Sequence, residues 1–310
     1  MQAIRAEHLS KSFDGRQVLR DVTFSVEKGE IFGYLGPNGA GKTTTINLFL
    51  GLLSPDTGTA EVFGADLGSD DEARRRVGVL FENNGFSERQ SAYENLRYYA
   101  GLYGMDEPEG RIEELFRVTG LSDRSTDSVG TFSTGMKRKL GIARAILHRP
   151  DVVFLDEPSS GLDPDAQRMV RDLILSLSEK EGMTVFINSH HLDEVQRICS
   201  RVAILAEGKI QAYDSVARLA GAGKESSVWI AFEGGKPSRQ TIASLESLSM
   251  VLDIQEEGEG IVCRLAEEGS IPDLISALVS GGYRIEEIKK RSADLEEVYL
   301  RYVHSVEGRS

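Results

Sequence analysis

Short hydrophobic runs and longer amphipathic stretches alternate along the first two thirds of the chain. Residues 30–35 and 151–156 are dominated by apolar side chains, as is typical of parallel strands that are covered on both faces. Residues 44–50 and 165–181 carry helical patterns, and residues 184–189 form a further strand-like run. This alternation predicts an α/β domain with a mostly parallel core sheet.

Two further regions belong to the same predicted domain. Residues 2–62 are read as strands and tight turns, which predicts an N-terminal antiparallel β subdomain. Residues 87–150 have helical patterns and end at Pro150, so we interpret them as a helical insert. The first domain is therefore expected to span residues 1–220.

The composition changes at the Ala-Gly-Ala-Gly-Lys segment 220–224, and a second domain is expected over residues 221–310. Its pattern predicts, in order, strand 226–232, helix 238–248, strands 250–256 and 261–265, helix 271–280 and strand 283–289. The order β-α-β-β-α-β is that of a small ferredoxin-like α+β module. A last helix is expected near 294–303, and this region carries no chemical motif.

Composition and charge narrow the range of functions. The 310 residues are 40% hydrophobic and 27% charged, which is ordinary for a globular protein. A net charge of −13 argues against a nucleic-acid groove, so no nucleic-acid partner is expected. The basic run 137–139 is interpreted as the exposed first turns of a helix.

The sequence also predicts where the protein resides. No apolar run is long enough to span a bilayer, and the first residues lack a secretory signal. Cys199 and Cys263 are far apart and form no metal or redox pattern. We therefore expect a reduced, cytoplasmic setting.

Residues 36–43 read Gly-Pro-Asn-Gly-Ala-Gly-Lys-Thr and lie between a predicted strand and a predicted helix. This is a phosphate-binding loop of a P-loop NTPase, because glycines let successive backbone N–H groups face one anion at a helix N-terminus. Lys42 can reach the β- and γ-phosphates, and the Thr43 hydroxyl can bind Mg²⁺. The residues expected to hold the phosphates are Gly36, Pro37, Asn38, Gly39, Ala40, Gly41, Lys42, Thr43 and Thr44.

Two carboxylates, Asp156 and Glu157, follow the strand 151–156 directly. Open α/β sheets bind ligands at the carboxyl ends of their strands. Asp156 suits the oxygen-rich shell of Mg²⁺, and Glu157 suits a general base for the attacking water. Taken alone, the pair is also compatible with a helix cap.

A second anion site is suggested at Ser133, at the start of the predicted helix that continues to residue 147. Ser133 has the position of an N-cap, and Gly135 permits close approach of a ligand to the backbone. A simple structural N-cap remains the alternative for this segment.

The ordered motifs resemble the ATP-binding subunit of an ABC transporter over residues 3–219 and, more loosely, to the end. Residues 36–44 match the Walker A loop, 152–157 Walker B, 133–136 the signature, 160–163 the D-loop and 188–190 the switch histidine. The resemblance implies an ATPase that uses ATP and Mg²⁺. It assigns catalysis to Lys42, Glu157, His190 and Glu82, and the metal to Thr43, Asp156 and Glu82. It extends the nucleotide contacts to Phe13, Val18, Ser133, Gly135, Met136 and Asp163.

Some of these assignments compete with structural readings. Phe13 resembles the aromatic residue that stacks on adenine, with Val18 at another edge of the ring, but Phe13 is equally compatible with a core position. His191 is read as a helix-start residue rather than the switch histidine.

The chain departs from the family pattern at two positions. Glu82 stands where the family has the glutamine of its Q-loop, and it brings a negative charge towards the triphosphate. Met136 replaces the last glutamine of the signature, in a form that resembles subunits that export drugs, antibiotics, polysaccharides or sodium.

The resemblance further implies two kinds of partner. A second ATPase subunit, most simply another copy of this chain, would complete each nucleotide site with its signature. Integral membrane permease subunits would dock near residues 83–97, where Tyr93, Tyr98, Tyr99 and Tyr103 gather, and would hold the protein at the inner face of the membrane. The helical spacing of these tyrosines favours core packing for at least half of them. The alternatives are a soluble ABC-type ATPase that acts on ribosomes or DNA, and a regulatory module that binds ATP with little hydrolysis.

Overall fold

The computed structural model describes residues 1–310 except 82–84, 222–225, 267, 292–294 and 308–310. The chain divides into two compact units, Met1–Ser215 with the chain end from Tyr302, and Val216–Arg301. The boundary expected after residue 220 stays a prediction. Among the described residues, no helix has both the length and the apolar character that crossing a membrane requires.

The first unit is built on a six-stranded sheet. Its strands, in spatial order, are β5 (Val77–Leu80), β6 (Val152–Asp156), β7 (Thr184–Ser189), β3 (Ile31–Leu35), β8 (Arg201–Ala206) and β9 (Lys209–Ser215). All neighbours are parallel except β8 and β9. Every residue of β3, β6 and β7 is buried, which explains their continuous apolar sequences. The predicted mostly parallel core sheet is confirmed.

A separate three-stranded antiparallel sheet is built from the N-terminal region, as predicted. It has the order β2 (Arg16–Glu27), β1 (Gln2–Phe13), β4 (Thr57–Val62). Phe24 of β2 joins it to the central sheet, because its ring stacks on Phe32 with centroids 5.6 Å apart and meets the edge of Phe49 at 5.8 Å. This buried aromatic cluster holds the base of the phosphate loop, since Phe32 lies on β3 and Phe49 on the helix that follows the loop.

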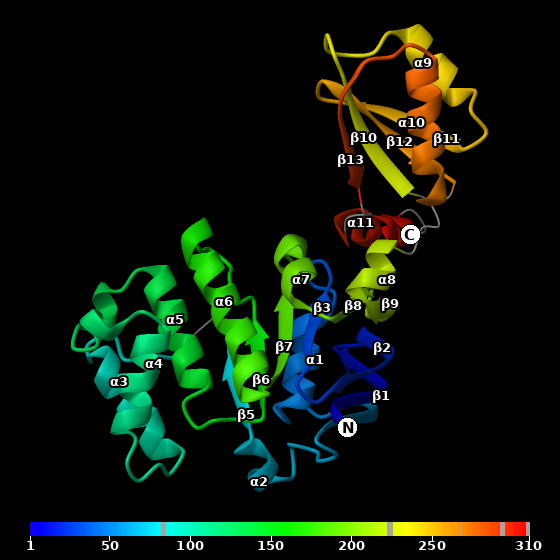
Figure 1. The fold of residues 1–310 in the computed structure, drawn as a ribbon. Coiled ribbons are helices and arrows are strands. Elements are labelled where there is room, and N and C mark those ends of the chain that lie inside the picture. The colour runs from blue at the N-terminus through cyan, green and yellow to red at the C-terminus, as the bar shows by residue number, and fades with distance from the viewer. Residues whose placement is uncertain (82–84, 222–225, 267, 292–294, 308–310) are drawn as a thin grey trace. The chain divides into compact units, whose positions relative to one another are not determined.

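Helices flank the central sheet and form the insert. The helices that connect strands of this unit outside the insert are α1 (Lys42–Phe49), α2 (Asp71–Arg74), α6 (Pro164–Glu181) and α7 (Leu192–Ile198). The insert contains α3 (Ala92–Leu102), α4 (Glu109–Val118), the 3₁₀ turns Ser122–Arg124 and Val129–Thr131, and α5 (Thr134–Ala145). Figure 1 shows α3, α4 and α5 grouped on the side of this unit away from β1 and β2. α5 returns the insert to the sheet, because it contacts β5.

The second unit contains α8 (Val216–Gly221), β10 (Ser226–Phe232), α9 (Arg239–Glu246), β11 (Val251–Glu257), β12 (Gly260–Leu265), the 3₁₀ turn Glu268–Ser270, α10 (Ile271–Ser280) and β13 (Ile285–Arg291). The helix α11 (Leu295–Glu307) begins in this unit, which ends at Arg301. Its antiparallel sheet has the order β11-β12-β10-β13. Leu245, Leu274 and Leu278 from α9 and α10 pack with Val228 and Ile261 of the central strands. The β-α-β-β-α-β succession is the ferredoxin-like arrangement predicted from the sequence.

Candidate nucleotide-binding site

The phosphate loop connects β3 to α1 at the carboxyl edge of the central sheet. A side chain at Gly36 would place its Cβ 2.3 Å from the backbone oxygen of Leu205, so only glycine fits there. Gly39 and Gly41 have φ angles of 80° and 109°, which L-residues rarely adopt. Gly41 is also the N-cap of α1. The loop conformation therefore depends on the glycine positions that the sequence displays.

Lys42 is the first residue of α1 and is only 7% exposed. Its Nζ donates hydrogen bonds to the backbone oxygens of Gly36 at 2.7 Å and Pro37 at 3.1 Å. Burial lowers the pKa of Lys42, and the charges of Glu157 and Asp156 oppose that shift. The loop thus encloses a cation whose partners in this structure are carbonyls of the loop itself.

Asp156 ends β6 and faces the first turn of α1. Its Oδ2 accepts a hydrogen bond from the Thr43 hydroxyl at 3.4 Å, and its Oδ1 accepts one from the Asn188 amide. Burial raises the pKa of the Asp156 carboxyl, and Glu157 adds to the rise. The Thr43 hydroxyl and the buried Asp156 carboxylate place oxygen atoms side by side, and oxygen atoms are the ligands that Mg²⁺ prefers. A cation bound there would favour the ionised form of Asp156. The residues present therefore fit a magnesium ion.

Glu157 is held with an unusual backbone. Its φ is 52°, a left-handed conformation that costs on the order of 1–3 kcal/mol in a residue other than glycine. Its N–H donates to the backbone oxygen of Asn188 at 2.9 Å, and the Arg138 guanidinium donates to its carbonyl. Its Oε2 lies 2.8 Å from Nδ1 of His190, an ion-pair distance without the geometry of a hydrogen bond.

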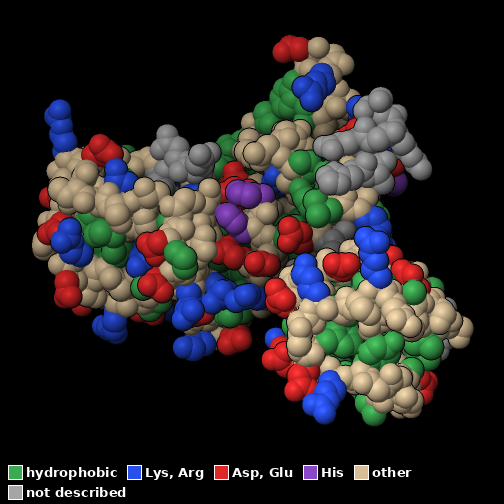
Figure 2. All heavy atoms as spheres, turned by 90° about the horizontal axis from the view of Figure 1, so that it is seen from above, with side chains coloured by type: hydrophobic (Ala, Val, Ile, Leu, Met, Phe, Trp, Pro, Cys, Tyr) green, Lys and Arg blue, Asp and Glu red, His purple; other side chains and the backbone are tan. Residues whose placement is uncertain are grey.

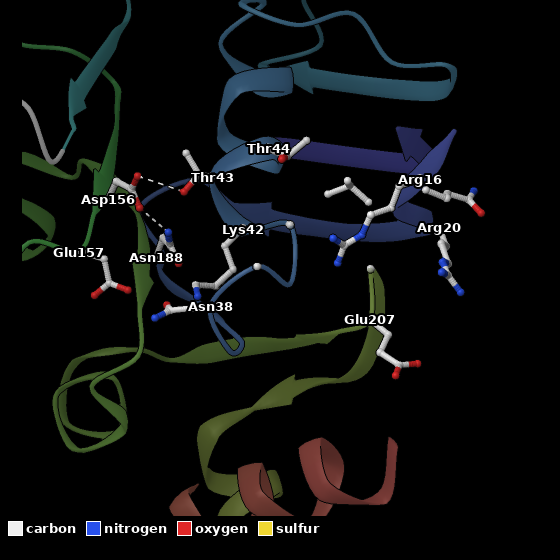
Figure 3. A pocket seen from close by; sticks show the side chains of 15 residues that line it. Arg16, Arg20, Asn38, Lys42, Thr43, Thr44, Asp156, Glu157, Asn188 and Glu207 are labelled. Carbon is white, nitrogen blue, oxygen red and sulfur yellow. Dashed lines mark hydrogen bonds between the residues drawn. The ribbon is translucent and has the colours of Figure 1, made fainter. Parts of the chain in front are cut away.

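These groups border one cavity of about 670 Å³. Figure 3 shows Lys42, Thr43, Asp156, Glu157 and Asn188 together at one end, with Arg16, Arg20 and Glu207 at the other. The described residues that line it are Arg16, Gln17, Val18, Arg20, Asn38, Gly39, Gly41, Lys42, Thr43, Thr44, Asp156, Glu157, Asn188, Glu207 and Gly208. A lysine, backbone N–H groups and a metal-binding pair at one end of an elongated pocket are suited to a nucleoside triphosphate.

Comparison with known proteins agrees with this geometry. The ABC transporter family matches residues 19–160. The ABC transporter ATP-binding protein YhcH of Bacillus subtilis is 33% identical over 96% of this chain and 94% of its own length. The chain belongs to the ABC transporter ATP-binding proteins.

Two further relatives support the assignment. The bacitracin transport ATP-binding protein BcrA of Bacillus licheniformis is 33% identical over 97% of both chains. A solved ATP-binding subunit of an ABC transporter is 32% identical, covers 70% of this chain and 91% of its own, and superposes with a TM-score of 0.65. The protein is thus an ABC-type ATPase that binds ATP.

The end of the ATP pocket away from the phosphate loop includes Val18 but not Phe13. Phe13, the last residue of β1, is 40% exposed, and Nζ of Lys11 lies 5.5 Å from the centre of its ring. Stacking of Phe13 on adenine stays a prediction.

The signature and D-loop residues lie elsewhere on the ATPase unit. Ser133 is exposed and is the N-cap of α5, where its hydroxyl accepts the N–H of Met136 at 3.3 Å. Gly135 lies beside Leu162 and Ala166 at the start of α6, and Asp163 caps α6 by accepting the Ala166 N–H at 2.8 Å. None of Ser133, Gly135, Met136 and Asp163 lines the cavity of their own chain.

Two predicted features fall wholly or partly outside the described residues. Glu82 lies outside the described residues, and its proposed contacts with metal and water stay predictions. The first residues of the expected docking region 83–97 also lie outside them. Just after this region, Tyr98 is 61% exposed, whereas Tyr99 donates to the Gly85 backbone oxygen at 2.9 Å.

Sequence reasoning missed two residues of the site, Arg138 and Asn188. Arg138 belongs to the basic run that was expected to be exposed, but it is 5% exposed and donates to the backbone oxygens of Phe81 and Glu157. Its helical spacing from the buried residues Ile142 and Ala145 was the available signal. The partner of Asn188 depends on pairing of β6 with β7, which the sequence does not display.

Proposed function

We propose that the chain couples hydrolysis of magnesium ATP to export of a substrate through separate membrane subunits. The observation that supports this most strongly is the convergence of Lys42, Thr43, Asp156 and Glu157 on one cavity. The signature form at Met136 and the similarity to BcrA, a bacitracin transport protein, favour the export direction.

In the proposed mechanism, the loop and Lys42 hold the triphosphate. Lys42 exchanges its bonds to the Gly36 and Pro37 carbonyls for bonds to phosphate oxygens, and the N-terminus of α1 adds its partial charge. Thr43 and Asp156 would hold Mg²⁺, which when bound offsets the negative charge of the phosphates.

Glu157 and His190 would orient the water that attacks the γ-phosphate. The Glu157 carboxylate accepts a proton from the water, while His190, 2.8 Å away, holds the carboxylate in place. Glu157 is suited to this role because its backbone is fixed by both β7 and α5, so that the carboxylate needs little reorganisation.

The active unit would be a head-to-tail pair of ATPase chains. Ser133, Gly135 and Met136 are at the surface or only partly covered in the single chain, and they surround the N-terminus of α5, where N–H groups can bind an anion. A second copy would supply these groups to the γ-phosphate bound by the first, and ATP would favour the closed pair. Permease subunits would bind near α3 and hold the pair at the inner face of the membrane.

The test is Glu157→Gln, which keeps the size of the side chain but removes its basicity. We expect ATP binding and ATP-dependent pairing to persist while steady-state phosphate release falls at least about 100-fold, within the range that a general base contributes. Glu113→Gln, at an exposed position on α4, is the matched control and should retain wild-type turnover. Near-normal turnover of Glu157→Gln would remove Glu157 from the proposed role.

A further inference from the structure

Two adjacent histidines and one carboxylate meet beside the ATP pocket. One ligand-type atom of each of Glu157, His190 and His191 lies within 4.8 Å of the others, and the two imidazole centres are 4.2 Å apart. His190 is exposed and His191 half-buried. Figure 2 shows histidine side chains together on an open face, with carboxylates beside them. An ion from solution can therefore reach this cluster.

One potential metal-ligand atom of the cluster, a carboxylate oxygen, accepts no hydrogen bond. Glu157 Oε2 is enclosed by protein, yet no hydrogen bond satisfies it in this structure. Burying a carboxylate oxygen without a hydrogen bond raises the free energy of the folded protein, and binding a cation at that oxygen offsets the cost. Nδ1 of His190 lies 2.8 Å from this oxygen.

Hydrogen bonds of the backbone fix the segments that carry these three residues. The backbones of Glu157 and Asn188 are joined by the N–H···O bond of 2.9 Å, which fixes the end of β6 against the end of β7. The His191 N–H donates to the Ser189 hydroxyl at 3.0 Å, at the start of α7. The ligand atoms thus project from the ends of paired strands, as rigid metal sites require.

We propose that Glu157, His190 and His191 form a site for a transition-metal ion of the zinc type, and that its occupation inhibits ATP hydrolysis. Two imidazoles and one carboxylate are a donor set that suits Zn²⁺, whereas Mg²⁺ prefers oxygen donors only. Ligand atoms around a tetrahedral zinc are about 3.4 Å apart, at bond lengths near 2.0–2.1 Å. The ligand atoms of the cluster lie within 4.8 Å of one another, close to that spacing, and water would supply the fourth ligand.

The inhibitory part rests on the proposed function of Glu157 and His190. A carboxylate bound to zinc cannot accept the proton of the attacking water, and an imidazole bound to the same ion cannot hold that carboxylate towards the nucleotide. His191 has no role in the proposed hydrolysis, so it separates the metal site from the chemistry.

Binding is tested on the full nucleotide-free chain with Zn²⁺ and Co²⁺, by calorimetry and by the absorption of Co²⁺ in excess Mg²⁺. We expect one ion per chain, no thiolate-to-cobalt band, and at least 10-fold weaker binding in His191→Gln and in His190→Gln. His8→Asn is the matched control, because His8 pairs with Asp21 at 2.7 Å on the exposed surface and asparagine tolerates its φ of 49°. Equal affinity in the wild type and His191→Gln would overturn the site, with circular dichroism checking that both are folded.

Inhibition is tested by phosphate release at saturating magnesium ATP with increasing Zn²⁺. His191→Gln should keep the basal rate and require at least 10-fold more Zn²⁺ for half inhibition, while His8→Asn should match the wild type. Zinc that binds at the site without slowing turnover would overturn the inhibitory step. Failure of the proposed function itself would appear separately, as normal turnover of Glu157→Gln without any zinc.

Discussion

At the scale of single residues, the nucleotide site is defined by charged groups held in the protein interior. The phosphate loop keeps Lys42 almost wholly out of water, and two carbonyls of the loop accept hydrogen bonds from its ammonium group. Asp156 is buried in the same place, with Thr43 and Asn188 as its donors. Burying charged groups costs folding free energy unless opposite charge lies nearby. The site is therefore complementary to both phosphate and a cation.

His148 is a half-buried titratable residue away from the ATP pocket. Its Nε2–H donates to the Val77 backbone oxygen at 3.1 Å, its ring stacks on Tyr103 at 3.8 Å, and Nδ1 has no partner. Burial, with a smaller contribution from the Arg111 charge, lowers the pKa of His148 to about 4. Protonation would place a second donor where no acceptor stands.

This environment predicts a pH dependence of stability. The unfolded chain binds a proton at His148 near pH 6.5 and the folded chain only near pH 4, so the contribution is full above pH 6.5 and is lost as pH falls towards 4. The loss is at most about 3 kcal/mol, at 1.36 kcal/mol per pKa unit. In urea unfolding, His148→Leu should lose less stability than the wild type between pH 7 and 4.5. Parallel curves for the two proteins would contradict the prediction, and His8→Asn serves as control.

At the scale of elements, the β3–loop–α1 unit depends on how closely its loop approaches β8. The Gly36 Cα lies against the Leu205 backbone oxygen, whereas a Cβ at Gly39 would meet no atom within 4 Å. The two glycines are therefore needed for different reasons: contact at Gly36, and a positive φ at Gly39.

Two alanine substitutions separate these reasons. Gly39→Ala should lower the free energy of unfolding by about 1 kcal/mol, the cost of a left-handed alanine. Gly36→Ala should cost at least about 2 kcal/mol, because the loop or β8 must move to relieve the clash. Urea titrations without nucleotide measure both. Equal costs would show that contact with Leu205 does not constrain the loop.

In the helical insert, some interactions join neighbouring residues and others join residues that are distant in the sequence. Ser91 begins α3 with a capping box, in which its hydroxyl accepts the Glu94 N–H and the Glu94 carboxylate accepts the Ser91 N–H. Such local signals define helix starts from sequence. The role of Arg138 is not local, because its carbonyl partners come from the segment after β5 and from Glu157 after β6.

At the scale of the whole molecule, the ATPase unit presents a phosphate pocket and, outside its lining, a second helix N-terminus at Ser133. In the part of a single chain that the structure describes, these two anion-binding features do not share the cavity. In the proposed head-to-tail pair, the helix N-terminus at Ser133 of each copy would face the phosphate pocket of the other copy.

The pairing proposal predicts the behaviour of Ser133→Arg in the Glu157→Gln background. A large cation at the start of α5 should block closure on the partner's nucleotide, so ATP-dependent dimers should be lost while each chain still binds ATP. Analytical ultracentrifugation with and without ATP measures the first, and fluorescent-nucleotide titration the second. Glu113→Arg on α4 is the control and should still dimerise. Dimers of Ser133→Arg at wild-type strength would show that Ser133 lies outside the interface.

The sequence by itself determined the elements and the local motifs. Continuous apolar runs identified the buried strands, the glycine pattern identified the phosphate loop, and alternating strands and helices gave the ferredoxin-like module. These succeed because hydrophobic periodicity, capping and glycine conformation are local properties of the chain.

Only the tertiary structure decided which distant groups meet. The pairing of Asp156 with Asn188 follows from the parallel register of β6 and β7, and the burial of Arg138 follows from α5 packing on β5. The cluster of Glu157, His190 and His191 likewise requires two strand ends to lie side by side. Contacts of this kind depend on strand order and register, which result from the packing of the whole sheet and not from any one segment.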